Sequence, residues 1–295
     1  MGQTEKEKWI QSGKIASQIM QKALKLAKPG TPLLEIAEKL ESEVEKQKVQ
    51  WAFPVNLSIN EIAAHASPSY DDIRKAEGLL KIDLGISVDG YISDIAKSVD
   101  LTPEQKHKDM IKANEKALAE AVKIAKHGIA INEIGKKIHE AITNAGFSPI
   151  RNLSGHEMQK YNLHAGINIP NYDNNNKTKL EEGIYAIEPF ATAGEGVVID
   201  GKPSGIFMLL EKKPARDMKT REILDFIEKN YHTLPFSSRW IIKKFGTSCM
   251  IRLSNLALND TLHSFSELVE KSRSPVSQAE HTILVEKDKV TVLTE

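Results

Sequence analysis

The sequence predicts an α+β fold that consists of two related α/β halves, a helical insert and a pair of closing strands. Two observations predict the halves: the same succession of helix and strand patterns occurs twice, and four short markers recur in order at a spacing of roughly 100 residues. A third observation predicts the insert, because the pattern becomes mostly helical between residues 212 and 271.

Each expected element follows from the spacing of apolar residues and from the turn residues between them. The Lys-Pro-Gly-Thr-Pro sequence at 28–32 separates the first two helices, and Lys126-His127-Gly128 separates the next two. Helices are expected at 5–28, 32–48, 103–126 and 131–145, and extended segments at 51–60, 78–94, 280–286 and 290–293. Residues 197–210 are expected to form a strand pair that turns at Asp200-Gly201.

Four markers indicate an internal duplication. In chain order they pair Glu35-Ile36 with Glu133-Ile134, Asn56-Leu57-Ser58 with Asn152-Leu153-Ser154, His65-Ala66 with His164-Ala165, and Gly78–Asp83 with Gly183–Glu188. Chance matches rarely keep one order with slowly changing offsets. The duplication therefore places Asp83 and Glu188 at equivalent points of the two halves, and His65 and His164 likewise.

The segment from Gly78 to Asp94 predicts a β-hairpin that brings two carboxylates together. Asp89-Gly90 accepts the positive φ angles of a tight turn, so Asp83 should oppose Ala96 and Asp94 should oppose Gly85. The two aspartates then lie on one face as diagonal neighbours, about 7–8 Å apart at the backbone. Because an ionised Asp83 between Ile82 and Leu84 is costly without compensation, a cation is the expected partner.

Composition narrows the classes of function. The chain has 295 residues with 40 basic and 40 acidic side chains, so no net field favours nucleic acid or a membrane. It has a single cysteine, Cys249, and no apolar run of membrane-spanning length. No signal-peptide core is present at residues 1–10, and we expect a cytoplasmic protein. The slight basic excess of the insert is interpreted as a solvated face.

The candidate metal ligands are four acids and one histidine: Asp83, Asp94, His156, Glu188 and Glu280. Four carboxylates at one place repel each other, and two divalent cations would keep all of them ionised near neutral total charge. An oxygen-rich set with one imidazole suits Mn, Fe, Co or Zn rather than a thiolate-type zinc site.

These stretches resemble the methionine aminopeptidases of type 2, which have the pita-bread fold. The resemblance rests on Phe53-Pro-Val-Asn-Leu-Ser-Ile-Asn-Glu-Ile-Ala-Ala-His65, Lys81-Ile-Asp-Leu-Gly with Asp94, Asn152-Leu-Ser-Gly-His156, Leu163-His-Ala-Gly166, Ala186-Ile-Glu-Pro-Phe190, Thr233-Leu-Pro-Phe with Arg239-Trp240, and Glu280-His-Thr-Ile283. It implies two pseudo-symmetric halves around a central antiparallel sheet, with residues 1–211 and 272–295 as the catalytic domain and 212–271 as the insert subdomain.

The resemblance also implies roles for matched positions. Asp83 would chelate one metal, His156 and Glu188 the other, and Asp94 and Glu280 would bridge both. His164 is expected to donate a hydrogen bond to the scissile carbonyl, His65 to position the following peptide unit, and Glu188 to shuttle a proton. Phe53, Leu163 and the Thr233–Phe236 segment would enclose the methionine side chain. The implied substrates are the N-termini of nascent polypeptides, with the ribosome as a candidate partner, and the chain is expected to be a monomer.

Two departures and two alternatives accompany this interpretation. The residue before Glu280 is usually aromatic in the family and is Ala279 here, which removes packing behind the last strand; the loop Ser67–Lys75 also looks short. A proline dipeptidase on the same fold is the enzymatic alternative, although its histidine motifs differ. The other alternative is a non-catalytic relative that binds RNA or the ribosome, which would be expected to lose metal ligands.

Overall fold

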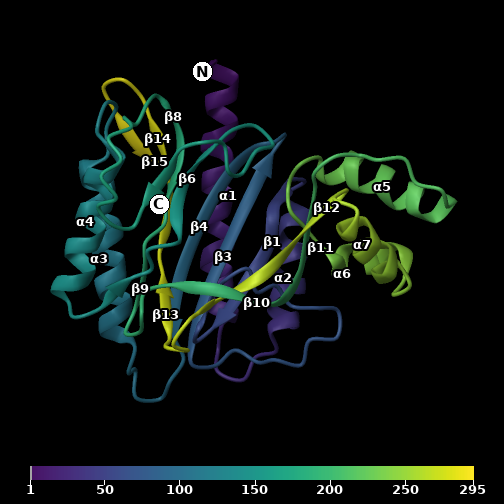
Figure 1. Ribbon diagram of the computed structural model, residues 1–295, viewed down its shortest axis with the longest axis horizontal. Coiled ribbons are helices and arrows are strands. Elements are labelled where there is room, and N and C mark those ends of the chain that lie inside the picture. The colour runs from purple at the N-terminus through teal and green to yellow at the C-terminus, as the bar shows by residue number, and fades with distance from the viewer. Residues whose placement is uncertain (1) are drawn as a thin grey trace.

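The structure, a computed structural model, describes residues 2–295. Figure 1 shows its helices α1 (Gln3–Leu26), α2 (Leu33–Lys46), α3 (Lys108–Ile124), α4 (Ile131–Asn144), α5 (Met218–Tyr231), α6 (Ser238–Phe245) and α7 (Cys249–Leu258). The strands are β1 (Gln50–Ile59), β2 (Ile62–Ala64), β3 (Leu79–Val88), β4 (Tyr91–Asp100), β5 (Ser148–Pro149), β6 (Ser154–Met158), β7 (Asn168–Pro170), β8 (Gly183–Ile187), β9 (Phe190–Thr192), β10 (Val198–Leu209), β11 (Phe236–Ser237), β12 (Leu262–Glu270), β13 (Val276–Gln278), β14 (Glu280–Val285) and β15 (Val290–Val292).

The central sheet has eight strands and is antiparallel throughout. Its order is β1-β3-β4-β14-β8-β6-β7, and β15 pairs with β14. The β3–β4 pair of the first half adjoins the β8–β14 pair of the second half. The two halves therefore meet where β4 pairs with β14, as the predicted pseudo-symmetry requires.

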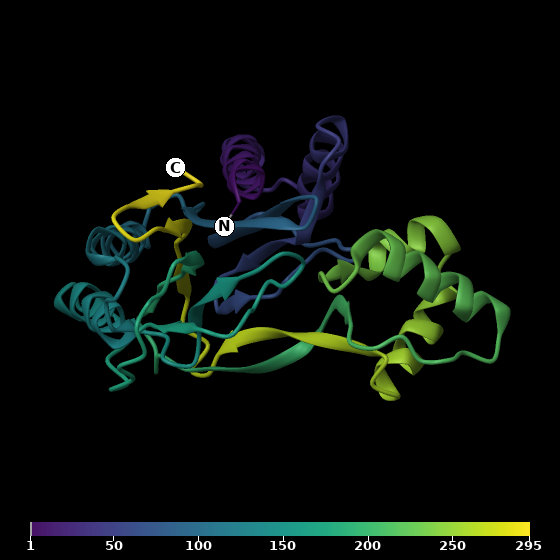
Figure 2. The same ribbon diagram turned by 90° about the horizontal axis from the view of Figure 1, so that it is seen from above.

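Helices cover one face of this sheet and leave the other face for polar side chains. Helices α1 and α2 pack on β1 and β3, while α3 and α4 pack on β8 and β14; Figure 2 shows the first helix pair on one side of the sheet. Leu80, Ile82, Leu84 and Ile86 belong to the core under α1 and α2. Since side chains alternate along a strand, Asp83 projects from the opposite face.

A long ribbon of β10 and β12 crosses that opposite face and leads to α5, α6 and α7 (Figures 1 and 2). The predicted strand pair around Asp200-Gly201 is wrong, because β10 runs unbroken through these residues and its partner β12 comes much later in the chain. The register shifts between Asp200 and Pro203, so the Asp-Gly pair lies in an irregularity rather than a turn. The helical expectation for 212–271 is likewise wrong for β12.

Helix α6 is tied to the rest of the molecule by Glu41 of α2. Its carboxylate accepts hydrogen bonds from Arg239 Nη1 at 2.7 Å, Arg239 Nη2 at 2.8 Å and Trp240 Nε1 at 2.6 Å. A two-pronged arginine pair of this kind fixes orientation as well as distance. The division into a catalytic domain and an insert subdomain at residues 212 and 271 stays a prediction.

The small side chain of Ala279 borders a cavity on the helix-covered face of the sheet. The cavity has a volume of about 410 Å³ and is bounded by β4, β14 and α3, with Leu118 and Val122 among its lining residues. We expect Ala279→Phe to fill part of it and to raise the free energy of unfolding by about 0.5–2 kcal/mol, measured by thermal unfolding.

A matched control is Ala117→Phe, because Ala117 is also buried but does not border this cavity. Overpacking there should destabilise the protein. Equal destabilisation by Ala279→Phe would show that the space beside Ala279 cannot accept a ring.

Candidate metal centre

Four strands of the central sheet and the residue that follows a fifth strand place the five predicted ligands. Asp83 lies within β3, Asp94 within β4 and Glu280 at the start of β14, while His156 lies in β6 and Glu188 directly follows β8. The predicted hairpin register is confirmed, since Asp83 opposes Ala96 and Gly85 opposes Asp94. Ala96 also pairs with Glu280, so the two halves of the sheet deliver their acids side by side.

The five side chains form two overlapping groups. Ligand atoms of Asp94, His156 and Glu280 lie within 4.8 Å of one another, and so do those of Asp83, Glu188 and Glu280. His156 Nε2 is 3.7 Å from Asp94 Oδ2. Glu280 belongs to both groups, which is the arrangement that two adjacent cations with a shared carboxylate require.

Several atoms of these residues are buried without a hydrogen-bond partner within residues 2–295. They are Asp83 Oδ1, Asp94 Oδ1, both carboxylate oxygens of Glu280 and His156 Nδ1. In the part of the chain that the structure describes, side-chain amides donate to two of the four acids: Asn56 Nδ2 donates to Asp83 Oδ2 at 3.3 Å, and Gln278 Nε2 donates to Glu188 Oε1 at 2.8 Å. Buried anionic oxygens of this number fit divalent cations, and one imidazole beside them fits the same metals.

The electrostatics of the cluster agree with that donor set. Burial, and then the neighbouring carboxylates, raise the pKa of Asp94, Glu188 and Glu280 well above the ordinary value, and burial raises the pKa of Asp83 to about 6. Burial, and then His164, lower the pKa of His156 to about 3. The His156 ring is therefore neutral near pH 7 and able to ligate a metal.

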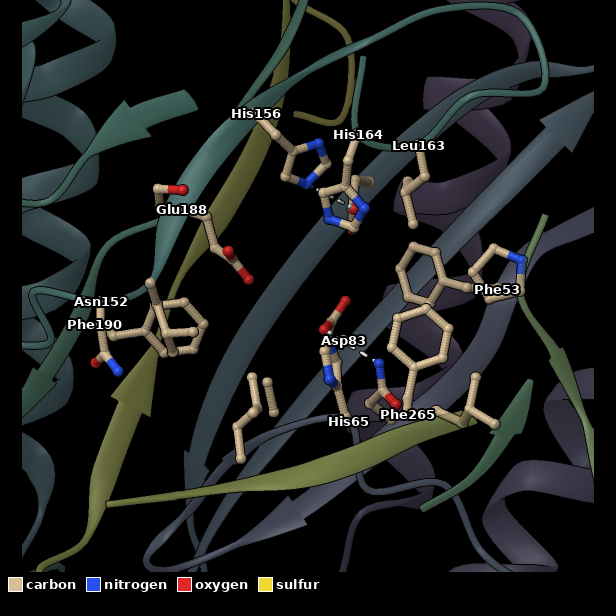
Figure 3. A pocket seen from close by; sticks show the side chains of 18 residues that line it. Phe53, His65, Asp83, Asn152, His156, Leu163, His164, Glu188, Phe190 and Phe265 are labelled. Carbon is tan, nitrogen blue, oxygen red and sulfur yellow. Dashed lines mark hydrogen bonds and ion pairs between the residues drawn. The ribbon is translucent and has the colours of Figure 1, made fainter. Parts of the chain in front are cut away.

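His65 and His164 lie on either side of the same pocket (Figure 3). The ring of His164 is 4.3 Å from that of His156 between centroids, and burial lowers the pKa of His164. His65 has φ of 62°, a left-handed conformation that is costly for this residue type, and burial lowers its pKa to about 4. Its ring packs edge-on against Phe265 at 5.3 Å.

The pocket has a volume of about 210 Å³ and mainly apolar walls. Phe53 and Leu163, which the sequence singles out, both line it. From the Thr233–Phe236 segment Pro235 lines it, whereas Phe236 is buried in the core of the insert. The remaining apolar lining residues are Ala64, Leu153, Phe190, Ile206, Phe265 and Leu268.

Sequence reasoning missed Gln278 and Phe265 as residues of the site. Gln278 lies two positions before Glu280, and that spacing along an extended segment could have indicated a shared face. Phe265 gave no signal, because it lies in the stretch that was expected to be helical and is part of β12.

Gly85 gives the Phe53 ring its place in the pocket wall. A methyl group at Gly85 would lie 2.3 Å from Phe53 Cε1 and 2.9 Å from the backbone oxygen of Ser93. We expect Gly85→Ala to destabilise the protein by about 1–3 kcal/mol in urea unfolding, because the ring or the strand must move. Adding Phe53→Leu should recover part of the loss, and a strictly additive double variant would contradict the contact.

None of the helices within residues 2–295 combines the length and apolar composition needed to cross a membrane.

The sequence model of metallopeptidase family M24 matches residues 7–238. A methionine aminopeptidase of Pyrococcus abyssi (strain GE5 / Orsay) is 44% identical over 294 residues, which cover 98% of this chain and 99% of the relative. The methionine aminopeptidase of Methanocaldococcus jannaschii is 44% identical over 291 residues, covering 98% of each chain.

Solved structures with the same architecture include a methionine aminopeptidase of Thermotoga maritima, with a TM-score of 0.71 and 21% identity over 100% of this chain and 98% of that chain. A thermophilic Arx1 has a TM-score of 0.83 and 15% identity, covering 99% and 91%. A prolidase of Pyrococcus furiosus has a TM-score of 0.65 and 19% identity, covering 100% and 64%. These likenesses bear on the fold alone, and they confirm the predicted pita-bread fold.

Proposed function

The chain belongs to metallopeptidase family M24, and we infer from its relatives, which are 44% identical over nearly the whole chain, that it is a metal-dependent methionine aminopeptidase, which hydrolyses the peptide bond after an N-terminal methionine. The observation that carries this conclusion is the pair of ligand groups sharing Glu280 beside a pocket with mainly apolar walls. A cluster of buried acids needs cations, and an unbranched thioether needs an apolar cavity.

We propose that Asp83 would hold one of two divalent ions, that His156 and Glu188 would hold the other, and that Asp94 and Glu280 would serve both. The unpartnered oxygens of Asp83, Asp94 and Glu280 support this assignment. Glu188 lies in one ligand group with Asp83, and His156 lies in the other. Substitution of Glu188 and of His156 therefore tests whether the two residues hold the same ion. When bound, two divalent ions would polarise the scissile carbonyl and activate the attacking water near neutral pH.

The remaining roles are hydrogen bonding to the substrate, proton transfer and enclosure of the methionine side chain. His164 beside His156 donates a hydrogen bond to the scissile carbonyl as negative charge develops, and His65 on the facing side holds the following peptide unit. Glu188, held by Gln278, passes a proton to the leaving amine. Phe53 and Leu163 enclose the methionine side chain.

Cleavage of Met-Ala-Ser compared with Ala-Pro tests the proposed function. Release of methionine from the tripeptide, with little or no hydrolysis of Ala-Pro, is the expected result. Hydrolysis of Ala-Pro alone would reject the assignment in favour of a proline dipeptidase. A folded protein that takes up no divalent ion in elemental analysis would favour a non-catalytic binding protein.

The proposed function also concerns the metal that is bound in the cell, the substrates and the location of the protein. Co, Mn, Fe and Zn all suit the donor set, so the metal in the cell depends on availability. The substrates are N-termini of nascent polypeptides, and a cytoplasmic location follows from that role. The ribosome as a partner and a monomeric state stay predictions.

A further inference from the structure

A second cavity adjoins the active-site pocket. It has a volume of about 420 Å³ and lies between the Arg151–Ser154 segment, the Gly166–Pro170 segment and the Asn-rich loop that follows. Two stretches of chain lead from the first cavity into it. Asn152–Ser154 lines both, and the loop that places Leu163 and His164 in the first continues as Gly166 and Ile167 in the second.

Residues 171–178 form one wall of this second cavity. They lie in no helix or strand, but hydrogen bonds fix their conformation. The buried Asn171 Nδ2 donates to the backbone oxygens of Leu153 at 3.0 Å and of Ile150 at 3.4 Å. Side-chain oxygens of Asp173, Asn174 and Asn176 each accept a backbone N–H two residues further on, at 3.0 Å. The backbone of this segment also accepts hydrogen bonds from Ile131 and Asn132 at the start of α4. The wall is therefore preorganised.

This wall and the neighbouring Arg151 present hydrogen-bond donors to the second cavity. The side-chain oxygens of Asn174 and Asn176 accept backbone N–H groups, whereas their amide Nδ2 groups make no hydrogen bond within residues 2–295 and are available to a ligand. Arg151 is the one charged residue that lines the cavity, and its guanidinium makes no hydrogen bond or ion pair within residues 2–295. The adjacent Glu157 carboxylate accepts from Ile167 N–H and from Gln159 Nε2.

Gly166 lines the second cavity two residues after His164, which lines the first. Its φ of 114° is accessible mainly to glycine, and a methyl group there would meet Glu157 Oε2 at 3.4 Å. In Figure 3 Asn152 and Phe53 lie on opposite sides of Asp83. A polypeptide whose first side chain lies against Phe53, with its first peptide bond at the acids, therefore continues towards Asn152.

We propose that this second cavity binds the substrate polypeptide beyond its second residue and favours acidic side chains there over basic ones. The proposal rests on the proposed aminopeptidase function and extends it to the downstream sequence of the substrate. The Arg151 guanidinium and the two asparagine amides supply the attraction for carboxylates, and the lining offers no anion to a lysine.

The test uses the metal-loaded full chain and C-terminally amidated peptides, so that the terminal carboxylate adds no charge. Met-Ala-Asp-Asp-Ser, Met-Ala-Ser-Ser-Ser and Met-Ala-Lys-Lys-Ser are compared by kcat/KM at low salt. We expect the acidic peptide to exceed the basic one by about fivefold to tenfold, a preference that shrinks as salt screens it. Arg151→Glu should reverse the order, and Arg216→Glu on the insert should leave it unchanged.

The outcomes separate this proposal from the function on which it rests. Equal kcat/KM for the three peptides would overturn the downstream preference while leaving the aminopeptidase intact. An acidic preference that survives Arg151→Glu would overturn its assignment to this cavity. Failure to release methionine from any peptide, Met-Ala-Ser included, would overturn the proposed function itself.

Discussion

Glu280→Gln is expected to lower kcat/KM for Met-Ala-Ser by on the order of 1,000-fold or more, which corresponds to about 4 kcal/mol of transition-state stabilisation. Glu280 is the one side chain in both ligand groups, and both of its oxygens are buried without a protein partner. The amide keeps the size of the side chain but removes the anionic charge that holds two cations together. Elemental analysis should show fewer than two metal ions per chain.

Asp100→Asn provides the matched control on the neighbouring strand β4. Asp100 is also buried, but its carboxylate accepts from Thr102 N–H at 2.9 Å and His107 N–H at 2.6 Å, far along the strand from the ligand groups. This variant should lose some stability and keep its metal and its activity. If Glu280→Gln retained full metal content and activity, the shared-carboxylate centre would be rejected.

Local turn chemistry explains why the first half of the site could be predicted from sequence. Asp89-Gly90 adopts φ angles of 52° and 89°, and this tight turn fixes the whole register of β3 against β4. Asp83 and Asp94 are thereby placed without knowledge of any distant contact. The duplication then extends the argument, because Glu188 follows β8 at the point that corresponds to Asp83 in β3.

The same dipeptide at Asp200-Gly201 does not form a turn, so the local sequence alone does not decide the structure there. The choice between a turn and a continuous strand depends on which strand is available as a partner, and β12 is separated from β10 in the sequence by α5, α6 and α7. That choice depends on residues that are distant in the sequence, so a short stretch of sequence does not indicate it. Phe265 of the active-site pocket escaped prediction for this reason, since it belongs to β12.

The metal-free protein should lose stability as the pH rises from 6.5 to 8.5. The folded pKa values of Asp94, Glu188 and Glu280 lie well above their unfolded values, so their contribution to stability is present at low pH and is lost as pH rises through the folded values. The histidines have the opposite sign. The pKa values of His65 and His156 are lowered to about 4 and about 3, and their contribution is complete above the unfolded value of about 6.5.

Above pH 6.5 the carboxylates give a falling slope, and one proton bound only in the folded state corresponds to about 1.4 kcal/mol per pH unit, or about 3 kcal/mol over this range. Burial also lowers the pKa of Lys81, whose contribution has the opposite sign, so the part that belongs to the acids is the difference in slope between the wild-type protein and Glu280→Gln, which keeps Lys81. Urea unfolding of chelator-treated protein measures it. Added Mn²⁺ competes with these protons, so the rise in Tm that it causes should be small at pH 6 and large at pH 8. Glu280→Gln removes one of the titrating acids and should flatten the metal-free slope. Equal metal-free slopes for the wild-type protein and Glu280→Gln would show that Glu280 does not hold a proton in this range and would contradict the prediction.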